Sequence, residues 1–572
     1  MLFQRVSLLL VLLFLFAVLP AQQGKTSRLQ RIAVQSSANT FLRQEGYELD
    51  HGSNRNTSYV YADRRLLRKL DARQIAYRFA TEQFEEVAMV DAATWFAQKS
   101  NACEVPGDAY PTYELYEQMM TNFAAAYPQI TRLHSLGALP SGRRILALEI
   151  TDNPNSEEIE PKLLYSSSMH GDELGGYHVM LRFIAHLLCN YNVDPELTAL
   201  VNESEIWINP LANPDGAYAN GNNTVNGATR RNANGVDLNR NYPDPDNGPN
   251  PDGNEYQPET LIFMQLAEDV SFDLAMNIHG GAEVFNYPWD TYVDRHADND
   301  WWVHVAREFA DECQTDAAAQ GFNNYFNDLD NGITNGYDWY PIAGGRQDYM
   351  NFYNHAREAT LEISNVKLLP PSSFDAVWNS SRDALVNYLL QGTYGLRGTV
   401  LDSLTGEPLE ASVYIPGHDE LNSEVYSKLP TGRYHRYLKE GFYNVTFEAP
   451  GYHSKTVQVF VEDQAPTLLT VRLAPLNISS TSPFAAAELP ISLRYDEGQV
   501  FLGNLPTERR GEWYFQLLSN DGRSIMKSRI DEFGEQSKFS VGHLPTGIYL
   551  GRVVGEGQQQ TVQFNVVRKK RR

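Results

Sequence analysis

The stretch from about residue 110 to residue 390 constrains the fold most, because helical and strand patterns alternate along it. Apolar residues recur at helical spacing at residues 113–127, 177–191, 258–270, 301–319 and 376–391. Short apolar runs of strand length lie between them, at residues 145–150, 162–167, 206–208, 274–279 and 359–363. Such alternation predicts an α/β domain with a mixed sheet flanked by helices, in which reactive groups gather in loops at the strand ends.

The helical pattern stops after Tyr394, and short alternating strands with Gly and Pro turns follow. This pattern is typical of small all-β sandwiches, and a linker rich in Ser and Ala divides it in two. We therefore expect, in chain order, a signal peptide (1–21), a propeptide-like segment (22–105), the α/β domain (106–392), a β-sandwich (393–476), a linker (477–488) and a second β-sandwich (489–572).

The first 21 residues have the parts of a signal peptide. Arg5 provides the positive charge, an almost wholly apolar run covers residues 6–19, and Ala21 precedes polar sequence. A membrane anchor is the alternative, but the run is short for a bilayer span and lacks a stop-transfer flank. The mixed pattern at 22–105 fits a propeptide or a structural extension equally. We expect a secreted protein with no membrane span in the mature chain.

The net charge of −24 argues against a nucleic-acid partner, because phosphate contacts need clustered Lys and Arg. An acidic surface would attract cationic peptides, although solubility alone is the simpler explanation. The cysteines are Cys103, Cys189 and Cys313. With so few, we expect packing to stabilise the fold, and we expect Cys189, inside a helical pattern, to be a buried thiol.

Residue types that bind metals follow two of the predicted strands. His170 and Glu173 come just after the strand at 162–167, and His279 ends the strand at 274–279. Either histidine alone would more often be structural. Zinc binds imidazole nitrogen and carboxylate oxygen, and catalytic sites use three protein ligands and one water. The shared position at strand ends therefore predicts one zinc site.

A polar run at residues 230–241 begins with Arg230 and Arg231 and ends with Asn239, Arg240 and Asn241. Guanidinium groups bind carboxylates through paired hydrogen bonds and can polarise a carbonyl near a metal ion. A solvated polar loop would be the better interpretation if this run stood alone.

The run does not stand alone, because other motifs occur with it in the order of one enzyme family. They are His-Gly-Asp-Glu at 170–173, Asn-Pro-Asp-Gly at 213–216, Asn-Ile-His-Gly-Gly at 277–281, Gly-Ile-Thr-Asn-Gly at 332–336, Trp-Tyr at 339–340 and Thr-Leu-Glu-Ile at 360–363. Over residues 110–390 the chain resembles the zinc carboxypeptidases of the A and B type, and most closely their regulatory branch, carboxypeptidases N, E, M and D.

The resemblance implies a secreted metallocarboxypeptidase that hydrolyses the C-terminal peptide bond of peptides and proteins. One Zn²⁺ per chain would be held by His170, Glu173 and His279. Glu362 would be the general base, which takes a proton from the attacking water and passes it to the leaving amine. Asp237 would orient the first zinc histidine, and Arg230 would stabilise the oxyanion.

The resemblance also implies how substrate binds. Asn239 and Arg240 would hold its terminal carboxylate, and Tyr340 would close over it. Asp290 and Gln347 match the residues that line the pocket for basic side chains in the regulatory branch, so we expect release of Lys or Arg. The sequence departs from that branch at Arg346, where a Met is usual, and a cation beside the pocket would weaken this preference.

The C-terminal stretches carry weaker resemblances. Residues 393–476 resemble the transthyretin-like domain that follows such catalytic domains. Residues 489–572 are similar to the sorting domain of the bacterial type IX secretion system, through Leu-Pro-Thr-Gly-Ile-Tyr at 544–549 and a Lys/Arg-rich end. An ordinary accessory sandwich is the alternative for this last part. The resemblance implies secretion machinery as a partner, and a protein that is secreted or held on the outer surface of a Gram-negative bacterium.

Two other functions would use the same fold. The first is a peptidase that trims cell-wall peptides, and Asp290 and Gln347 argue against it. The second is a noncatalytic surface or adhesion protein, and the presence of Glu362 with all three zinc ligands argues against that. The expected substrates are therefore peptides or proteins with free C-termini.

Overall fold

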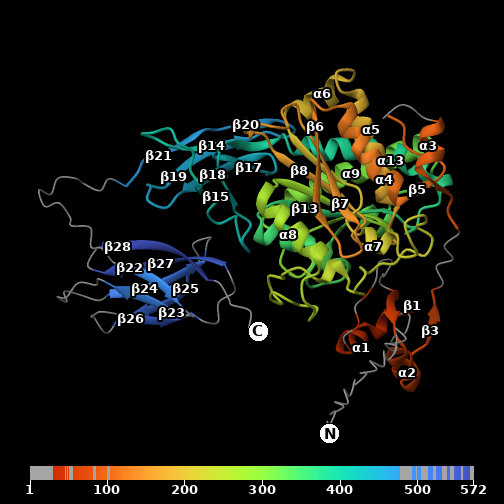
Figure 1. Cartoon of the computed structure of the whole chain (residues 1–572), viewed down its shortest axis with the longest axis horizontal. Coiled ribbons are helices and arrows are strands. Elements are labelled where there is room, and N and C mark those ends of the chain that lie inside the picture. The colour runs from red at the N-terminus through yellow and green to blue at the C-terminus, as the bar shows by residue number, and fades with distance from the viewer. Residues whose placement is uncertain are drawn as a thin grey trace, which may run out of the picture. The chain divides into compact units, whose positions relative to one another are not determined.

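In the computed structural model the chain divides into two compact units, Met1–Leu476 and Asn477–Arg572 (Figure 1). In the first unit it describes residues 30–45, 47, 49, 56–80, 86–98 and 103–476. In the second it describes residues 492–496, 499–503, 513–519, 524–530, 537–541, 547–555 and 558–566. The predicted signal peptide, the predicted linker and the basic end at 568–572 lie outside the described residues.

The centre of the first unit is an eight-stranded sheet with the order β12-β11-β13-β10-β8-β9-β7-β6. Its strands β13, β10, β8 and β9 are mutually parallel, and antiparallel neighbours lie on both sides of them. The bounds are β6 Thr131–Ala138, β7 Arg144–Ile150, β8 Lys162–Ser167, β9 Glu205–Asn209, β10 Leu274–His279, β11 Ala282–Tyr287, β12 Ile333–Asn335 and β13 Arg357–Ser364. The predicted mixed sheet is confirmed.

Helices cover both faces of this sheet, as Figure 1 shows for α4, α5 and α13 on one side and α8 on the other. They are α4 Tyr113–Ala126, α5 Gly175–Asn190, α8 Pro258–Val270, α9 Asn299–Ala319 and α13 Phe374–Gln391. Successive strand residues point to opposite faces, so Leu163 and Tyr165 join one hydrophobic core while Leu164 joins the other. Burial on both faces explains why these strands read as continuous apolar runs.

A small α/β layer precedes the large sheet. Its strands are β1 Gln30–Gln35, β2 Thr57–Ala62 and β3 Tyr77–Phe79, in the order β2-β1-β3, and its helices are α1 Asn39–Gln44 and α2 Arg64–Ala72. Asp63 caps α2 by accepting from the backbone N–H of Leu66. The apolar core of this layer also contains Tyr340 of the large domain, and the partly buried Trp339 and Ile342 pack against it, so the two parts contact each other directly.

The segment after this layer belongs to the large domain by its contacts. Strand β4 (Met89–Val90) pairs with β5 (Tyr110–Pro111), and Trp95 of α3 (Ala92–Gln98) is buried in the core that α4 and α5 share.

Two four-stranded sheets follow the large domain and enclose one apolar core. The first contains β14 Gly395–Asp402, β17 Arg433–Arg436, β20 Pro466–Leu468 and β21 Val471–Leu473, and the second contains β15 Ser412–Tyr414, β16 Val425–Tyr426, β18 Gly441–Glu448 and β19 Lys455–Val461. Buried ion pairs join this region to the α/β domain. Asp273 binds Lys428 and Arg433, and Asp298 accepts from Arg436.

The second unit contains only strands among its described residues. They are β22 Ser492–Asp496, β23 Gln499–Gly503, β24 Trp513–Ser519, β25 Ser524–Arg529, β26 Ser537–Ser540, β27 Gly547–Gly555 and β28 Gln558–Val566. They form two sheets, with the orders β22-β23-β26 and β25-β24-β27-β28. The first three residues of the Leu-Pro-Thr-Gly-Ile-Tyr motif lie outside the described residues, and its last three begin β27.

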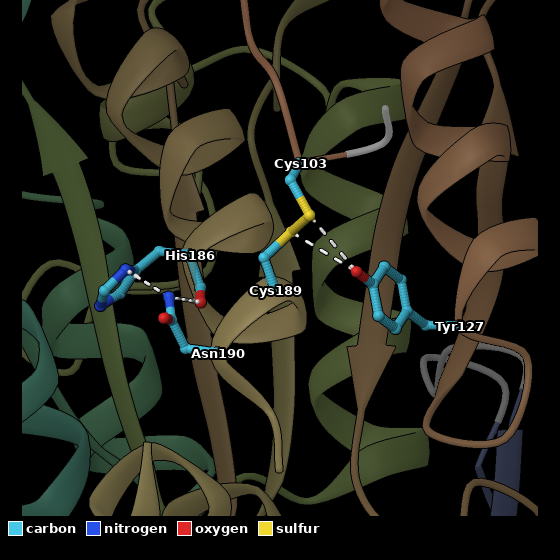
Figure 2. Close-up of a disulfide and its surroundings, with 5 residues drawn as sticks. All are labelled: Cys103, Tyr127, His186, Cys189 and Asn190. Atoms are coloured by element: carbon cyan, nitrogen blue, oxygen red, sulfur yellow. Dashed lines mark hydrogen bonds between the residues drawn. A yellow bond between two sulfur atoms is a disulfide. The ribbon is translucent and has the colours of Figure 1, made fainter. Parts of the chain in front are cut away.

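The expectation of a free thiol at Cys189 is wrong, because Cys103 and Cys189 form a disulfide (Figure 2). Their Cα atoms are 5.8 Å apart, which is within the usual range for a disulfide. The hydroxyl of Tyr127 lies 3.3 Å from the sulfur of Cys103 and 3.5 Å from that of Cys189. The cysteines are 86 residues apart in sequence, so no local pattern shows the pairing. Cys313 is free and buried.

None of the helices that the structure describes is both long enough and apolar enough to cross a membrane.

Candidate active site

The predicted ligands meet because they follow neighbouring parallel strands. The carboxyl ends of β8, β10 and β13 lie at one edge of the sheet. His170 comes just after β8, His279 is the last residue of β10, and Glu362 lies two residues before the end of β13. His279 and Glu362 are direct partners in the β10–β13 register.

The three predicted zinc ligands form one buried cluster. His170 Nδ1 lies 3.0 Å from Glu173 Oε2, and His279 Nδ1 lies 2.8 Å from the same oxygen. The two Nδ1 atoms are 3.0 Å apart. Ligand atoms of all three residues lie within 4.8 Å of one another, and each side chain is at most 1% exposed. Two imidazole nitrogens and a carboxylate that converge in this way fit a zinc ion.

Asp237 fixes the orientation of the first histidine. Its Oδ1 lies 2.9 Å from His170 Nε2, so this ring nitrogen donates and Nδ1 keeps its lone pair for a metal ion. Burial alone would raise the pKa of Asp237. The adjacent Arg230 and His170 outweigh burial and hold this pKa well below its usual range, so the carboxylate is ionised.

Arg230 lies against the same cluster. Its Nε donates to Asp237 Oδ2 at 2.9 Å, and its Nη1 lies 3.1 Å from Glu173 Oε1. The guanidinium of the neighbouring Arg231 donates to the carbonyl of Gly235 at 3.0 Å, and Arg231 lines the same cavity as Arg230. Arg230, to which the family resemblance gives the oxyanion role, is thus in contact with both Asp237 and Glu173.

The predicted carboxylate-binding residues stand beside the ligands. Asn239 is the middle residue of the short turn Leu238–Arg240 that Asp237 caps, and its Oδ1 accepts from the backbone N–H of Arg346 at 2.9 Å. Arg240 donates to the carbonyl of Asn239 at 2.8 Å and is 3% exposed. Arg230, Asp237 and Arg240 line one cavity of about 810 Å³.

The predicted specificity residues meet in a buried pocket. Asp290 Oδ1 accepts hydrogen bonds from Gln347 Nε2 and from Asn286 Nδ2, both at 3.1 Å. Gly336 is required there, because a Cβ atom on it would lie 1.8 Å from Asp290 Oδ1. Burial raises the pKa of Asp290 to about 6. Asn286 was not predicted from the sequence as a pocket residue, although it begins the segment Asn-Tyr-Pro-Trp-Asp at 286–290 that ends with Asp290.

Arg346 does not face this pocket. Its Nε donates to Glu358 Oε1 at 3.0 Å, its Nη1 donates to Ser166 Oγ at 3.0 Å, and its guanidinium lies over the ring of Phe263. Arg346 is 1% exposed and Glu358 is fully buried. The expected interference of this cation with a basic substrate therefore has no geometric basis.

Lys367 is a further residue that the sequence analysis missed. Its Nζ lies 3.4 Å from Glu173 Oε1 and 3.2 Å from the hydroxyl of Tyr61, which belongs to the N-terminal layer. Tyr47, Leu49 and Tyr61 form one wall of the cavity that Arg230 and Arg240 line. Tyr340, the predicted lid, is packed in the core of the same layer.

The fold and the site together define a class of protein. A mixed α/β sheet presents two histidines and a glutamate at the ends of parallel strands, with arginines beside them and an acidic pocket near by. This is the arrangement of a catalytic zinc centre in a metallohydrolase.

Comparison with known proteins gives the family. The zinc carboxypeptidase family model matches residues 116–384. The chain is 34% identical over 366 residues to carboxypeptidase SOL1 of Arabidopsis thaliana, which covers 63% of this chain and 71% of that protein. It is 35% identical over 383 residues to the carboxypeptidase N catalytic chain of Rattus norvegicus, which covers 60% and 82%.

A solved structure agrees with this result at the level of fold. Carboxypeptidase A from Helicoverpa armigera superposes with a TM-score of 0.51 at 17% identity, over 64% of this chain and 98% of that chain. The chain belongs to the zinc carboxypeptidase family. It is a zinc-dependent carboxypeptidase of the α/β type, and the buried cluster of His170, Glu173 and His279 fits the zinc ion that this family uses.

Proposed function

We propose that the chain is an exported carboxypeptidase that releases C-terminal Lys or Arg from peptides and proteins. The observation that carries the proposal is the pocket around Asp290, where a buried carboxylate is held by Asn286 and Gln347. Burying this anion is costly, and a basic side chain of the substrate would add to the compensation that the nearby Arg240 provides. The net charge of −24 is compatible with basic substrates.

His170, Glu173 and His279 would hold the zinc ion, which when bound supplies a Lewis acid that polarises the scissile carbonyl and activates water. Glu362 would take the proton from the attacking water and deliver it to the leaving amine. Its position supports this role, because it faces His279 across the β10–β13 pair. Arg230 would stabilise the oxyanion, a contribution typically worth about 3–4 kcal/mol per donor.

Recognition of the chain end would come from Asn239 and Arg240. A guanidinium binds a carboxylate through two parallel hydrogen bonds, which restricts cleavage to a free C-terminus. Tyr340 would close over the bound substrate. The glycine Gly345 borders both groups of residues, since a Cβ atom on it would lie 3.7 Å from Asn239 Oδ1 and 3.4 Å from Asp290 Oδ2. These distances support a single site that contains both the proposed carboxylate-binding residues and the acidic pocket.

Matched peptides ending in Arg, Lys, Leu, Phe or Glu test the specificity. The wild type should release Arg and Lys at least tenfold faster, and Asp290→Asn should remove this preference without abolishing release of Leu. Release of Leu or Phe in preference to Arg by the wild type would refute the basic specificity and leave the hydrolytic chemistry in place.

We further propose that the N-terminal layer acts as a propeptide that covers the site. Tyr47, Leu49 and Tyr61 line the cavity with Arg230, and the Tyr61 hydroxyl bonds to Lys367 beside the zinc ligand Glu173. Limited proteolysis that removes this layer should raise kcat/KM by at least tenfold. Equal activity before and after removal would make the layer a structural extension instead.

For the rest of the chain we propose the assignments made from sequence. Residues 393–476 would be a transthyretin-like β-sandwich, which the shared core of its two sheets supports. Residues 489–572 would be a sorting sandwich that engages secretion machinery and brings the enzyme outside a Gram-negative cell or onto its surface. The Cys103–Cys189 disulfide supports export, because such bonds persist in oxidising compartments. Secretion of a reporter fused to residues 489–572 tests this assignment.

A further inference from the structure

The two residues proposed to bind a basic side chain lie outside the strands, so other contacts must fix them. Asp290 follows β11 in an irregular loop, and Gln347 lies in the first turn of α12 (Arg346–Tyr353). A pocket that binds a charged side chain needs its polar groups held within about 0.5 Å of the productive geometry. Other side chains must therefore hold the Asp290 loop and the first turn of α12 together.

Asp348 is one residue that connects the Asp290 loop to the start of α12. It comes directly after Gln347 and is 1% exposed. Its Oδ1 accepts from the backbone N–H of Asp290 at 3.0 Å, and its Oδ2 accepts from the backbone N–H of Thr291 at 2.8 Å. The side chain of Asp348 on α12 thus orients the backbone of the loop that carries Asp290.

Asp244 connects the same two segments from a third loop, and it is also 1% exposed. Its Oδ2 accepts from the backbone N–H of Gly344, three residues before Gln347, at 3.0 Å. Its Oδ1 accepts from the hydroxyl of Thr291 at 3.2 Å and from the backbone N–H of Asn247 at 2.8 Å. Asp244 therefore bonds both to the loop that contains Thr291 and to the segment that precedes Gln347.

The carboxyl groups of the region favour a cationic substrate side chain, in addition to the fixed charge of Arg240, which lowers the pKa of Asp290. Asp290, Asp348 and Asp244 are buried, and hydrogen bonds to residues 290 and 291 connect the other two to the Asp290 loop. Burial raises the pKa of Asp348, and the neighbouring Asp290 raises it further. Two buried acceptors at the pocket, Gln347 Oε1 and Asn286 Oδ1, have no hydrogen-bond partner among the described residues. A guanidinium or ammonium group would satisfy these oxygens and offset the negative charge.

We propose that Asp348 and Asp244 are positioning residues for substrate specificity, which hold Asp290 and Gln347 in the geometry that binds a basic side chain. This inference rests on the proposed preference for Lys or Arg. The two residues act through the loops and do not touch the reacting bond.

The role of Asp348 requires two acceptor oxygens and not merely a polar side chain of the same size. Asp348 uses both oxygens to accept from the backbone N–H groups of Asp290 and Thr291. An asparagine has one acceptor oxygen, and its NH₂ group would face a backbone donor. Asp348→Asn should therefore shift the loop at residues 290–291 while leaving the side-chain volume unchanged.

The test compares Asp348→Asn and Asp244→Asn with Asp246→Asn, which removes the same charge from an exposed position in the Asp244 loop. The full-length protein is used, activated by limited proteolysis where the intact chain is inactive. Both pocket variants should lower kcat/KM for Arg- and Lys-ended peptides by at least tenfold, mainly through a higher KM. Release of Leu should change by less than threefold, and Asp246→Asn should match the wild type.

A double variant separates positioning from general damage. If Asp348 acts through Asp290, then adding Asp348→Asn to Asp290→Asn should change the Arg-to-Leu ratio of kcat/KM by less than twofold. Equal losses on Arg- and Leu-ended peptides, or loss of folding in both pocket variants, would overturn the proposal. A wild type without basic preference would instead refute the proposed function, and that result is read before any variant is compared.

Discussion

Replacing Arg346 by methionine probes the ion pair that lies behind the specificity pocket. The guanidinium donates to Glu358 at 3.0 Å and to Ser166 at 3.0 Å, and it lies 5.2 Å from the ring centre of Phe263. Neither member of the pair is more than 1% exposed. Methionine would fill much of the space but would leave Glu358 buried without a counter-charge.

The size of the effect follows from this burial. Removing one partner of a buried ion pair costs about 3–5 kcal/mol, because the remaining charge loses its solvation and its attraction together. In a domain of this size each kcal/mol lowers Tm by about 2–4 °C, so a fall on the order of 10 °C is expected. Replacing both residues, as Arg346→Met with Glu358→Gln, should restore most of the loss, since no buried charge remains.

Two assays show whether Arg346 affects stability or the specificity pocket. Thermal unfolding followed by tryptophan fluorescence gives Tm for the wild type, the single variant and the double variant. Peptides ending in Arg and Leu give the ratio of kcat/KM at 25 °C, which should change by less than threefold because Arg346 faces away from Asp290. A stable Arg346→Met variant with a strongly increased preference for Arg would show that the cation acts on the pocket, and would refute this reasoning.

Three further changes have defined outcomes. The kcat/KM for Arg-ended peptides should rise with pH through about 6, because burial raises the pKa of Asp290 to about 6 and only its ionised form attracts a cation. An Arg-to-Leu ratio that is flat between pH 5 and 8 would contradict this. Cys103→Ser with Cys189→Ser opens a loop of 86 residues and should cost about 2–5 kcal/mol, seen as a lower Tm. Wild type in reducing agent should then match the variant, and an unchanged Tm would mean that packing alone holds the segment. Asp237→Asn should weaken zinc binding by about 10–100-fold in a chelator competition, because the asparagine no longer fixes the His170 tautomer as a carboxylate does. Unaltered zinc affinity would remove Asp237 from the metal site.

The sequence was most informative where short-range patterns determine the structure. Strands β8 and β10 have the predicted bounds, because a strand buried on both faces is a continuous apolar run with clear ends. His170, Glu173 and His279 could be predicted for the same reason. Their position is set by where those strands end, and parallel neighbours bring their carboxyl ends to one edge.

The features that sequence reasoning missed depend on contacts between distant residues. The Cys103–Cys189 bond joins positions 86 residues apart, and no spacing rule relates them. Arg346 could be recognised as unusual, but its direction depends on Glu358, which lies on the next element of the chain. Lys367 and Tyr61 meet only because the N-terminal layer packs over the sheet edge. Such pairings are decided by tertiary packing and leave no local signal.

The central claim is that Glu362 and the zinc cluster hydrolyse the last peptide bond of a chain with a free carboxylate. The most direct measurement is mass-spectrometric detection of products from an Arg-ended peptide and from the same peptide with an amidated C-terminus. We expect chelator-sensitive loss of the terminal Arg from the free peptide alone, and at least a thousandfold lower rate for Glu362→Gln with zinc still bound. Cleavage of the amidated peptide at an equal rate, or full activity in the variant, would contradict the account.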